Sequence, residues 1–265
     1  MGGSSGTGYV KDLYGYSPSE NKWAALASYK ESAYGVSVCT QDDNVYAVAG
    51  ITSARWYTEL YTYSSNTWTQ FASLESDKKM ECIFPTSFVY KDSIILIGGE
   101  SLGESNLAVR DTIYRYDMIN QEWAGCGNFP VPIKAGVSIT SGDSVFVGLG
   151  NKPEDGPDER GLWINTSGNW SNWTRLAETP PEMKNVCSGV LFKDCLYYID
   201  NGGVIWRFNL TTKDWSKMSS FPKKLTNTPV DYRIFLLNDT IYIFLINYYS
   251  SYLKTYDPLW DVPQK

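Results

Sequence analysis

Apolar and polar residues alternate in short runs along this chain. Residues 85–90 end at the polar turn 91–93, and the apolar run 94–97 follows directly. Runs of roughly four to eight residues rich in aliphatic and aromatic side chains, separated by a short turn, are typical of a β-hairpin. The pattern therefore predicts two antiparallel strands in this part of the chain.

Two further strands are predicted in the same unit. Gly98 and Gly99 end the second strand, and a polar loop is expected to run from them to residue 111. Residues 112–117 alternate again and predict a third strand, and Trp123 opens a fourth. One unit thus predicts a sheet of four antiparallel strands.

The unit recurs about every 50 residues, which is a period typical of propeller blades. Each copy carries a turn with an aspartate, and the turns lie at Asp43, Asp92, Asp143, Asp194 and Asp239. Tryptophans keep the same spacing, at Trp23, Trp68, Trp123, Trp173 and Trp215. Such a sheet cannot bury its apolar faces alone and must stack on its neighbours. We therefore predict an all-β propeller.

The units resemble the kelch repeat. They share its length, the glycine pair after the second strand, and the tyrosine-to-tryptophan spacing of residues 16–23 and 116–123. The resemblance covers essentially the whole chain and implies a kelch-type β-propeller in a single domain, residues 1–265. The expected blades are residues 1–30 (partial), 31–79, 80–134, 135–184, 185–224 and 225–265.

The first of these six blades is expected to be incomplete. Residues 1–30 supply its third and fourth strands, and Gly2 and Gly3 resemble the end of a second strand. Either upstream residues have been lost or this blade is half built. The alternative is a closed ring of five blades, in which the N-terminal strands complete the last unit.

Composition and charge exclude several kinds of chemistry. The chain has 23 Lys and Arg against 29 Asp and Glu, a net charge of -6, which opposes attraction to nucleic-acid phosphates. It contains no histidine, and its five cysteines form no CxxC pair, so histidine triads, copper and structural zinc are not expected. The longest apolar run, 241–246, is far shorter than the ~20 residues of a membrane-spanning helix. We predict no metal, no cofactor, no nucleic-acid partner and no transmembrane segment.

Candidate binding residues lie in loops that a propeller would gather at its channel mouth. The loops after the second strands carry Arg55, Trp56, Tyr57, Glu100, Arg110 and Arg160. A lysine precedes the inner strand of successive blades, at Lys30, Lys79, Lys134, Lys184 and Lys224. A ring of lysines in an acidic protein would attract an anionic ligand such as a carboxylated sugar. The alternatives are that each lysine pairs with a neighbouring blade and that the loop residues are merely solvated.

Two stretches are similar to segments of the kelch-type N-acetylneuraminate epimerases, or sialic acid mutarotases, in a circularly permuted order. They are residues 130–136 with 145–150, and residues 33–37. The resemblance implies a catalytic glutamate after the glycine pair, matched here by Glu100, and an arginine, matched by Arg110. Glu100 would be the general acid or base at the anomeric centre, while Arg110 and the lysines would hold the sugar carboxylate.

Three functions are compatible with these residues and resemblances. The leading prediction is a non-enzymatic propeller that binds a glycan or a protein, located in the periplasm, at the cell surface or outside the cell. The second is a sialic acid mutarotase, and the third, an adaptor of the eukaryotic type, lacks an accompanying BTB-like segment. Aromatic residues such as Trp56, Tyr57, Tyr248 and Tyr249 suit stacking on sugars if they are exposed and blade packing if they are buried.

Overall fold

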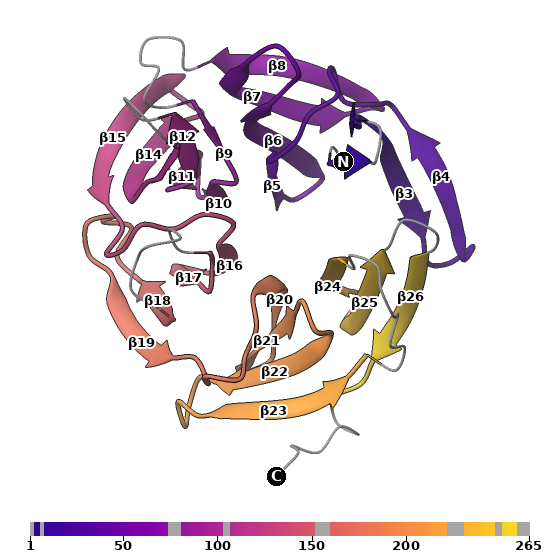
Figure 1. Ribbon diagram of the computed structural model, residues 1–265, viewed down its shortest axis with the longest axis vertical. Coiled ribbons are helices and arrows are strands. Elements are labelled where there is room, and N and C mark those ends of the chain that lie inside the picture. Colours follow the sequence, from indigo (N-terminus) through magenta and orange to yellow (C-terminus); the bar gives the residue numbers. More distant parts are fainter. Residues whose placement is uncertain are drawn as a thin grey trace. The chain divides into compact units, whose positions relative to one another are not determined.

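The computed structural model describes residues 3–5, 8–73, 81–102, 107–151, 160–221, 231–246 and 251–258. These residues form strands, turns and irregular segments, and no helix occurs among them (Figure 1). The predicted all-β class is confirmed. The same residues accordingly include no helix long and apolar enough to cross a membrane.

The chain divides into two compact units. The first comprises residues 1–135 with 152–157, and the second comprises residues 136–151 with 158–265. The single domain expected for residues 1–265 stays a prediction. Each unit is described below by itself.

The first unit contains two four-stranded antiparallel sheets, each connected in sequence order. The first sheet consists of β5 (Ser37–Gln41), β6 (Asn44–Ile51), β7 (Trp56–Ser64) and β8 (Thr67–Ser73). The second consists of β10 (Thr86–Tyr90), β11 (Ser93–Ile97), β14 (Thr112–Asp117) and β15 (Glu122–Asn128). The four strands predicted for the unit that begins near residue 85 are therefore confirmed.

The second unit repeats this design. One sheet consists of β16 (Val137–Ser141), β17 (Ser144–Gly148), β18 (Gly161–Asn165) and β19 (Thr174–Glu178). Another consists of β20 (Val186–Phe192), β21 (Cys195–Asp200), β22 (Val204–Asn209) and β23 (Trp215–Ser220). A three-stranded sheet follows, with β24 (Asp231–Leu237), β25 (Thr240–Ile246) and β26 (Ser251–Tyr256).

Smaller sheets complete the first unit. Strands β3 (Leu13–Ser17) and β4 (Lys22–Leu26) form a hairpin, and β1 (Ser4–Ser5) pairs with β2 (Gly8–Tyr9). Strands β9 (Cys82–Ile83), β12 (Glu100–Leu102) and β13 (Leu107–Val109) form a three-stranded sheet. The expectation of a polar loop from Gly99 to residue 111 was wrong, because β12 pairs with β13 on one side and with β9 on the other.

The four-stranded sheets share a local distortion as well as a strand order. The register between the third and fourth strand shifts once in every sheet, at Leu60/Tyr61, Thr112/Tyr114, Leu162/Trp163 and Val204/Trp206. Such a shift is a β-bulge, which increases the local twist of the strand pair. The repeat therefore extends to backbone geometry.

The recurring tyrosine and tryptophan pack across the hairpin of the third and fourth strands. The ring centroids of Tyr116 and Trp123 lie 5.2 Å apart, and those of Tyr16 and Trp23 lie 5.0 Å apart. The turn between Tyr116 and Trp123 is closed by Asp117, whose Oδ1 accepts hydrogen bonds from the backbone N of Ile119 and Asn120, both at 3.0 Å. The recurring spacing is thus a packing motif of this hairpin.

In the first unit, a core lies between the two four-stranded sheets. Val48 and Leu60 from one sheet pack with Ile94 and Leu96 from the other, and all four are buried. A second core, built from Tyr29, Ala33, Ala47, Tyr57 and Tyr61, lies on the opposite face of the β5–β8 sheet. These two cores fix the loops that carry the candidate residues.

Candidate functional site

Three backbone hydrogen bonds tie together the end of the second strand, the start of the third strand and the crossing that follows the sheet. Gly99 N donates to Ile133 O (2.8 Å), Arg110 N donates to Gly99 O (2.9 Å), and Ile133 N donates to Arg110 O (2.9 Å). The adjacent Gly98 has φ +65°, and a Cβ added there would lie 2.1 Å from Ile133 O. Only glycine fits this position. We call Gly99, Arg110 and Ile133 the charged frame. Arg110 is itself charged, and the residues that follow Gly99 and Ile133 are Glu100 and Lys134.

The charged frame brings together three residues predicted from the sequence. Lys134 Nζ lies 2.8 Å from Glu100 Oε1, and the two side chains are only 24% and 15% exposed. Arg110 Nε donates to the hydroxyl of the buried Ser101 at 2.8 Å. Lys134 therefore neutralises Glu100, and both residues belong to the same expected blade, 80–134.

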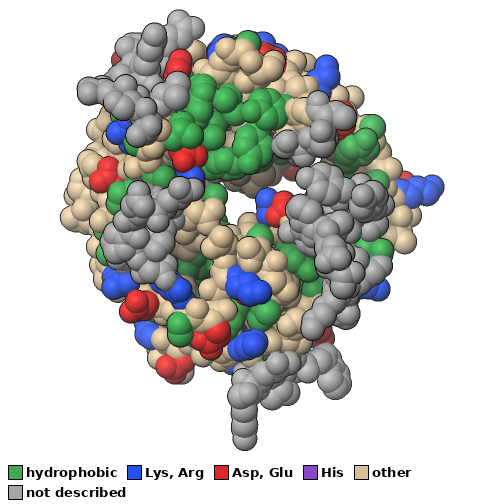
Figure 2. Space-filling model, viewed as in Figure 1, with side chains coloured by type: hydrophobic (Ala, Val, Ile, Leu, Met, Phe, Trp, Pro, Cys, Tyr) green, Lys and Arg blue, Asp and Glu red, His purple; other side chains and the backbone are tan. Residues whose placement is uncertain are grey.

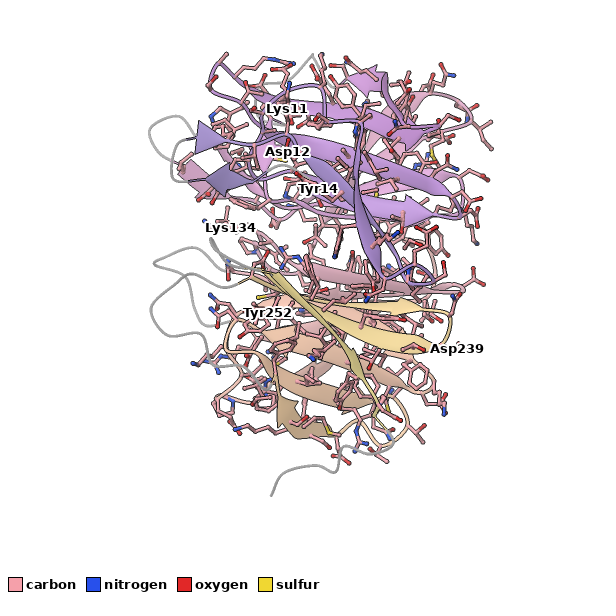
Figure 3. All side chains as sticks on the ribbon, turned by 90° about the vertical axis from the view of Figure 1, so that its right-hand side faces the viewer. Lys11, Asp12, Tyr14, Lys134, Asp239 and Tyr252 are labelled. Carbon is pink, nitrogen blue, oxygen red and sulfur yellow. The ribbon has the colours of Figure 1, made fainter. Side chains whose placement is uncertain are left out.

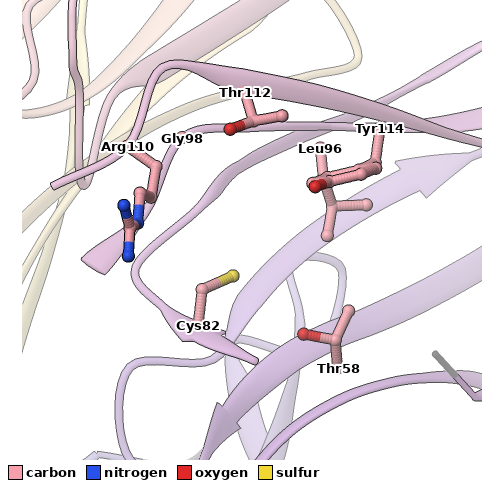
Figure 4. A pocket seen from close by; sticks show the side chains of 7 residues that line it. All are labelled: Thr58, Cys82, Leu96, Gly98, Arg110, Thr112 and Tyr114. Carbon is pink, nitrogen blue, oxygen red and sulfur yellow. The ribbon is translucent and has the colours of Figure 1, made fainter. Parts of the chain in front are cut away.

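A small cavity opens beside Arg110 (Figure 4). Its lining residues are Thr58, Cys82, Leu96, Gly98, Arg110, Thr112 and Tyr114. Its volume of about 10 Å³ is close to the smallest that holds one water molecule. Burial raises the pKa of the Cys82 thiol to about 12, although a hydrogen bond to Thr58 opposes the shift. The thiol is therefore protonated at neutral pH, and the cavity has no room for an organic ligand.

A second group of charged side chains surrounds the hydroxyl of Tyr61 on β7. Arg55 Nη1 lies 2.7 Å from Glu59 Oε1, and Arg55 Nη2 lies 3.5 Å from Glu31 Oε1. Lys30 Nζ donates to the hydroxyl of Tyr61 at 2.9 Å, and that hydroxyl donates to Glu59 Oε2 at 2.6 Å. The group therefore forms one continuous network.

The network has fixed protonation states near neutral pH. Burial would raise the pKa of Glu59, but the hydrogen bonds from Arg55 and Tyr61 outweigh it and hold the pKa below its usual value. Burial, together with the bond to Glu59, raises the pKa of Tyr61. Glu59 is thus ionised and Tyr61 protonated, which suits a structural network better than proton transfer.

The adjacent residues Trp56 and Tyr57 lie on opposite sides of β7 and have different environments. Trp56 is partly exposed, whereas Tyr57 is buried and donates a hydrogen bond to the hydroxyl of Tyr29 (3.4 Å). Burial raises the pKa of Tyr57 to about 12. Of this predicted pair, only Trp56 presents an accessible surface.

A row of three aromatic rings lies in the first unit, and the sequence had pointed to Tyr9 alone as a loop residue without predicting the row. We call Tyr9, Tyr34 and Phe84 the aromatic row. The rings of Tyr9 and Tyr34 are stacked with centroids 5.6 Å apart, and Phe84 meets Tyr34 edge-on at 5.0 Å. All three side chains are partly exposed. A signal in the sequence was available, because Tyr34 and Phe84 both lie just before an inner strand.

The backbone of the aromatic row is linked to two segments that carry predicted site residues. Tyr34 pairs through its backbone with Ile51, which in turn pairs with Trp56. Phe84 O accepts a hydrogen bond from Ala135 N (2.7 Å), next to Lys134. Figure 2 shows hydrophobic side chains gathered over this part of the first unit, around β6, β7 and β9. The row therefore lies in an apolar part of the first unit.

Two predicted residues of the second unit, Arg160 and Lys184, lie within the described ranges, and both are held near turns. Arg160 Nη1 donates to the backbone oxygen of Pro181 at 2.6 Å. Lys184 has an exposed side chain, and its backbone N donates to Asp200 Oδ2 at 3.3 Å. Lys79, Lys224, Tyr248 and Tyr249 lie outside the described residues.

Asp200 occupies the place of the glycine pair in its repeat and has a structural role. Its buried carboxylate accepts hydrogen bonds from Gly202 N (2.8 Å), Val204 N (3.0 Å) and the indole Nε1 of Trp206 (3.0 Å). A buried carboxylate with several N–H donors holds a turn in place. Here it fixes the loop between β21 and β22.

Neither a metal-binding cluster nor a known relative points to a function. Within the described ranges, no group of three or more Cys, Asp or Glu side chains could hold a metal ion. Comparison with models of known protein families and with curated proteins gave no match.

Proposed function

We propose that the protein is a kelch-type β-propeller of six blades, the first of them incomplete. The proposal is supported by the four sheets that share strand order, a bulge between the third and fourth strands, and a packed tyrosine and tryptophan in the hairpin of the first unit. A shared bulge is expected when copies of one unit must twist alike to stack on each other.

We further propose that the protein binds a carbohydrate on the aromatic row, without catalysis. The observation that carries this proposal is the contact between three partly exposed rings, Tyr9, Tyr34 and Phe84. The apolar face of a sugar ring packs on aromatic rings, and polar groups at the edge of such a site fix its orientation. The backbone of Tyr34 pairs with Ile51, which pairs with Trp56, and we propose that the indole of Trp56 belongs to that edge. A glycan ligand fits a location in the periplasm, at the cell surface or outside the cell.

The charged groups support binding more than catalysis. Glu100 is neutralised by Lys134, and Glu59 is held by Arg55 and Tyr61. A general acid or base needs a pKa near the working pH and access to the reacting atom. Each carboxylate is already held by a cation, Glu100 by Lys134 and Glu59 by Arg55. We therefore assign both carboxylates to the rigidity and charge of the site.

Substitution of Tyr34, the central ring, tests the binding proposal. A panel of oligosaccharides is first screened on an array, and the best ligand is then titrated by calorimetry. Tyr34→Ala should weaken binding at least about tenfold, since it removes the ring that contacts both others. Tyr14→Ala, which removes an exposed tyrosine outside the row, is the matched control and should bind normally. Absence of any saccharide ligand, or equal binding by both variants, would reject the proposal.

One observation favours the second candidate, a sialic acid mutarotase. The structure brings Glu100, Arg110 and Lys134 to one frame, and mutarotation needs only proton transfer. Proton NMR of the N-acetylneuraminate anomers measures the rate of equilibration directly. Acceleration by the protein that is lost in Glu100→Gln supports this candidate, and an unchanged rate with the unmodified protein eliminates it.

A further inference from the structure

Phe84 has an unusual backbone conformation for a large apolar residue. Its φ of +54° lies in the left-handed region, where the Cβ of most residues crowds the backbone. Among the described residues, only Leu149 shares both this conformation and a large apolar side chain. Leu149 is 9% exposed and packs in a hydrophobic core, whereas Phe84 is partly exposed. Core packing therefore explains the strained backbone at Leu149 but only in part that at Phe84.

The same position is left-handed in three successive segments of the chain. Gly35, Phe84 and Ala135 each lie two residues before an inner strand, β5, β10 or β16, and their φ values are +69°, +54° and +52°. Phe84 N donates to Gly35 O at 2.8 Å, and Ala135 N donates to Phe84 O at 2.7 Å. Glycine and alanine thus satisfy this chain of backbone bonds at the two equivalent positions. The backbone therefore does not require an aromatic ring at Phe84.

Gly35 allows the segment that carries Phe84 to approach Tyr34. A Cβ added to Gly35 would lie 2.7 Å from Cβ of Ile83, which is closer than two such atoms come in proteins. Only glycine therefore lets the backbone after Tyr34 pass so near the residue before Phe84. The ring of Phe84 is nearly perpendicular to that of Tyr34, at 87°, whereas the ring of Tyr9 is almost parallel to it, at 9°. The aromatic row consequently has a flat part, Tyr9 and Tyr34, and an upright part, Phe84.

The strained backbone of Phe84 favours a role in binding. Residues in sparsely populated backbone conformations persist where their surroundings hold them, and they gather at ligand sites. Both the N–H and the C=O of Phe84 are bonded to neighbouring segments, which fixes the residue. A fixed ring loses little conformational freedom when a ligand binds, so it can discriminate between ligands by shape.

We infer that Phe84 determines the specificity of the aromatic row and selects sugars that carry a methyl group at the edge of the ring. This inference rests on the proposed carbohydrate binding. A pyranose that packs flat on Tyr34 turns its edge toward Phe84, because the two aromatic rings are nearly perpendicular. A hydroxyl group against the phenyl ring would lose water without gaining a hydrogen bond, whereas a methyl group would bury apolar surface. A 6-deoxyhexose and an N-acetylhexosamine both supply such a methyl group.

Two matched pairs of methyl glycosides test the preference and distinguish the two sources of the methyl group. L-fucoside against L-galactoside compares a methyl with a hydroxymethyl group, and N-acetylglucosaminide against glucoside compares an N-acetyl with a hydroxyl group. Dissociation constants from ligand-observed NMR should favour the methyl-bearing sugar at least about tenfold in one pair. Equal affinities within both pairs, or binding of other sugars only, would overturn this inference alone. Absence of any saccharide ligand on the array would overturn the proposed function with it.

Substitution of single rings separates the upright part of the row from the flat part. Phe84→Ala should bring the ratio of the two dissociation constants in the preferred pair close to one, because it removes the surface that the methyl group contacts. Tyr34→Ala should weaken the binding of both sugars in that pair. Tyr14→Ala is the control, since Tyr14 lies on β3 outside the row and is 58% exposed (Figure 3), and it should keep the full preference. A preference that survives in Phe84→Ala would overturn the role of Phe84.

A glycine variant tests whether the ring is held against the preference of the backbone. Phe84→Gly and Phe84→Ala both lack the ring, but only alanine keeps a Cβ at the left-handed φ. Phe84→Gly should therefore unfold at a higher urea concentration than Phe84→Ala, and both should lose the methyl preference alike. Ala135→Gly makes the matched change in the next segment and should raise the urea midpoint while the preference is kept. A midpoint for Phe84→Gly no higher than that for Phe84→Ala would overturn the inference that the ring is kept in a strained conformation.

Discussion

The first unit contains the same backbone frame twice, once with apolar and once with charged side chains. In the apolar frame, Gly3 N donates to Ala33 O (2.8 Å), Val10 N donates to Gly3 O (3.0 Å), and Ala33 N donates to Val10 O (3.1 Å). Gly99, Arg110 and Ile133 make the same three bonds in the charged frame.

The side chains on the two frames have different chemistry. Ser4 and Tyr34 follow Gly3 and Ala33 in the apolar frame, at the places where Glu100 and Lys134 follow Gly99 and Ile133 in the charged frame. The frame is thus carried by backbone bonds, which leave the side chains free to differ. In this fold the repeat supplies geometry, and individual residues supply chemistry.

The largest expected effect comes from breaking the charged frame itself. Gly98→Ala places a Cβ 2.1 Å from Ile133 O and 2.8 Å from Arg110 O, so the backbone must move. We expect a loss of about 3 kcal/mol or more in the free energy of unfolding, measured by urea denaturation. Gly142→Ala has a similar φ of +55° with nothing within 4 Å, and it should cost only about 1 kcal/mol. Equal losses in the free energy of unfolding for the two variants would mean that the backbone of the charged frame moves at little cost.

The next effect concerns the ion pair that distinguishes the two frames. Lys134→Tyr leaves the largely buried Glu100 without its partner and should cost about 2 kcal/mol. The double variant Glu100→Ser with Lys134→Tyr installs the residues of the apolar frame and should cost less than this single change. A double-mutant cycle at neutral pH should give a coupling of about 1 kcal/mol. Strict additivity would show that the pair contributes nothing.

The smallest effect extends the comparison to the network around Glu59. Its folded pKa lies below the ordinary value of 4.5, so its stabilising contribution is present above that pH and is lost as the pH falls through the folded pKa. Glu59→Gln should cost about 1–2 kcal/mol at neutral pH. The difference between the two proteins should shrink in urea titrations below pH 4.5. A difference independent of pH would exclude the ionised carboxylate as its source.

Much of the fold could be predicted because its signals are local. The turn at residues 91–93 and the spacing of Tyr116 and Trp123 specify hairpins whose partners are neighbours in sequence. The hairpin of β12 and β13 was missed because its strands are short and are also held by β9, whose residues lie well upstream. Pairing that depends on such tertiary contacts leaves little periodic pattern.

The candidate site could be predicted only in part, for a related reason. Glu100, Arg110 and Lys134 were identified as separate loop residues, but the bond between Glu100 and Lys134 depends on a crossing that returns from the far end of the sheet. Tyr57 was expected at an accessible loop and lies inside, because adjacent residues of a strand face opposite sides and the sequence does not say which side is covered. The aromatic row joins three positions that are far apart in the chain.

The carboxylate of Asp200 also bears on how the protein ages chemically. Asn201 is followed by Gly202, a pair that deamidates readily in exposed loops when the glycine nitrogen attacks the asparagine side chain and closes a succinimide ring. Here that nitrogen donates its hydrogen to Asp200 Oδ1 at 2.8 Å, so it must give up this bond before it can react. The contact that fixes a turn in the second unit thereby slows a reaction that would otherwise add a negative charge to it.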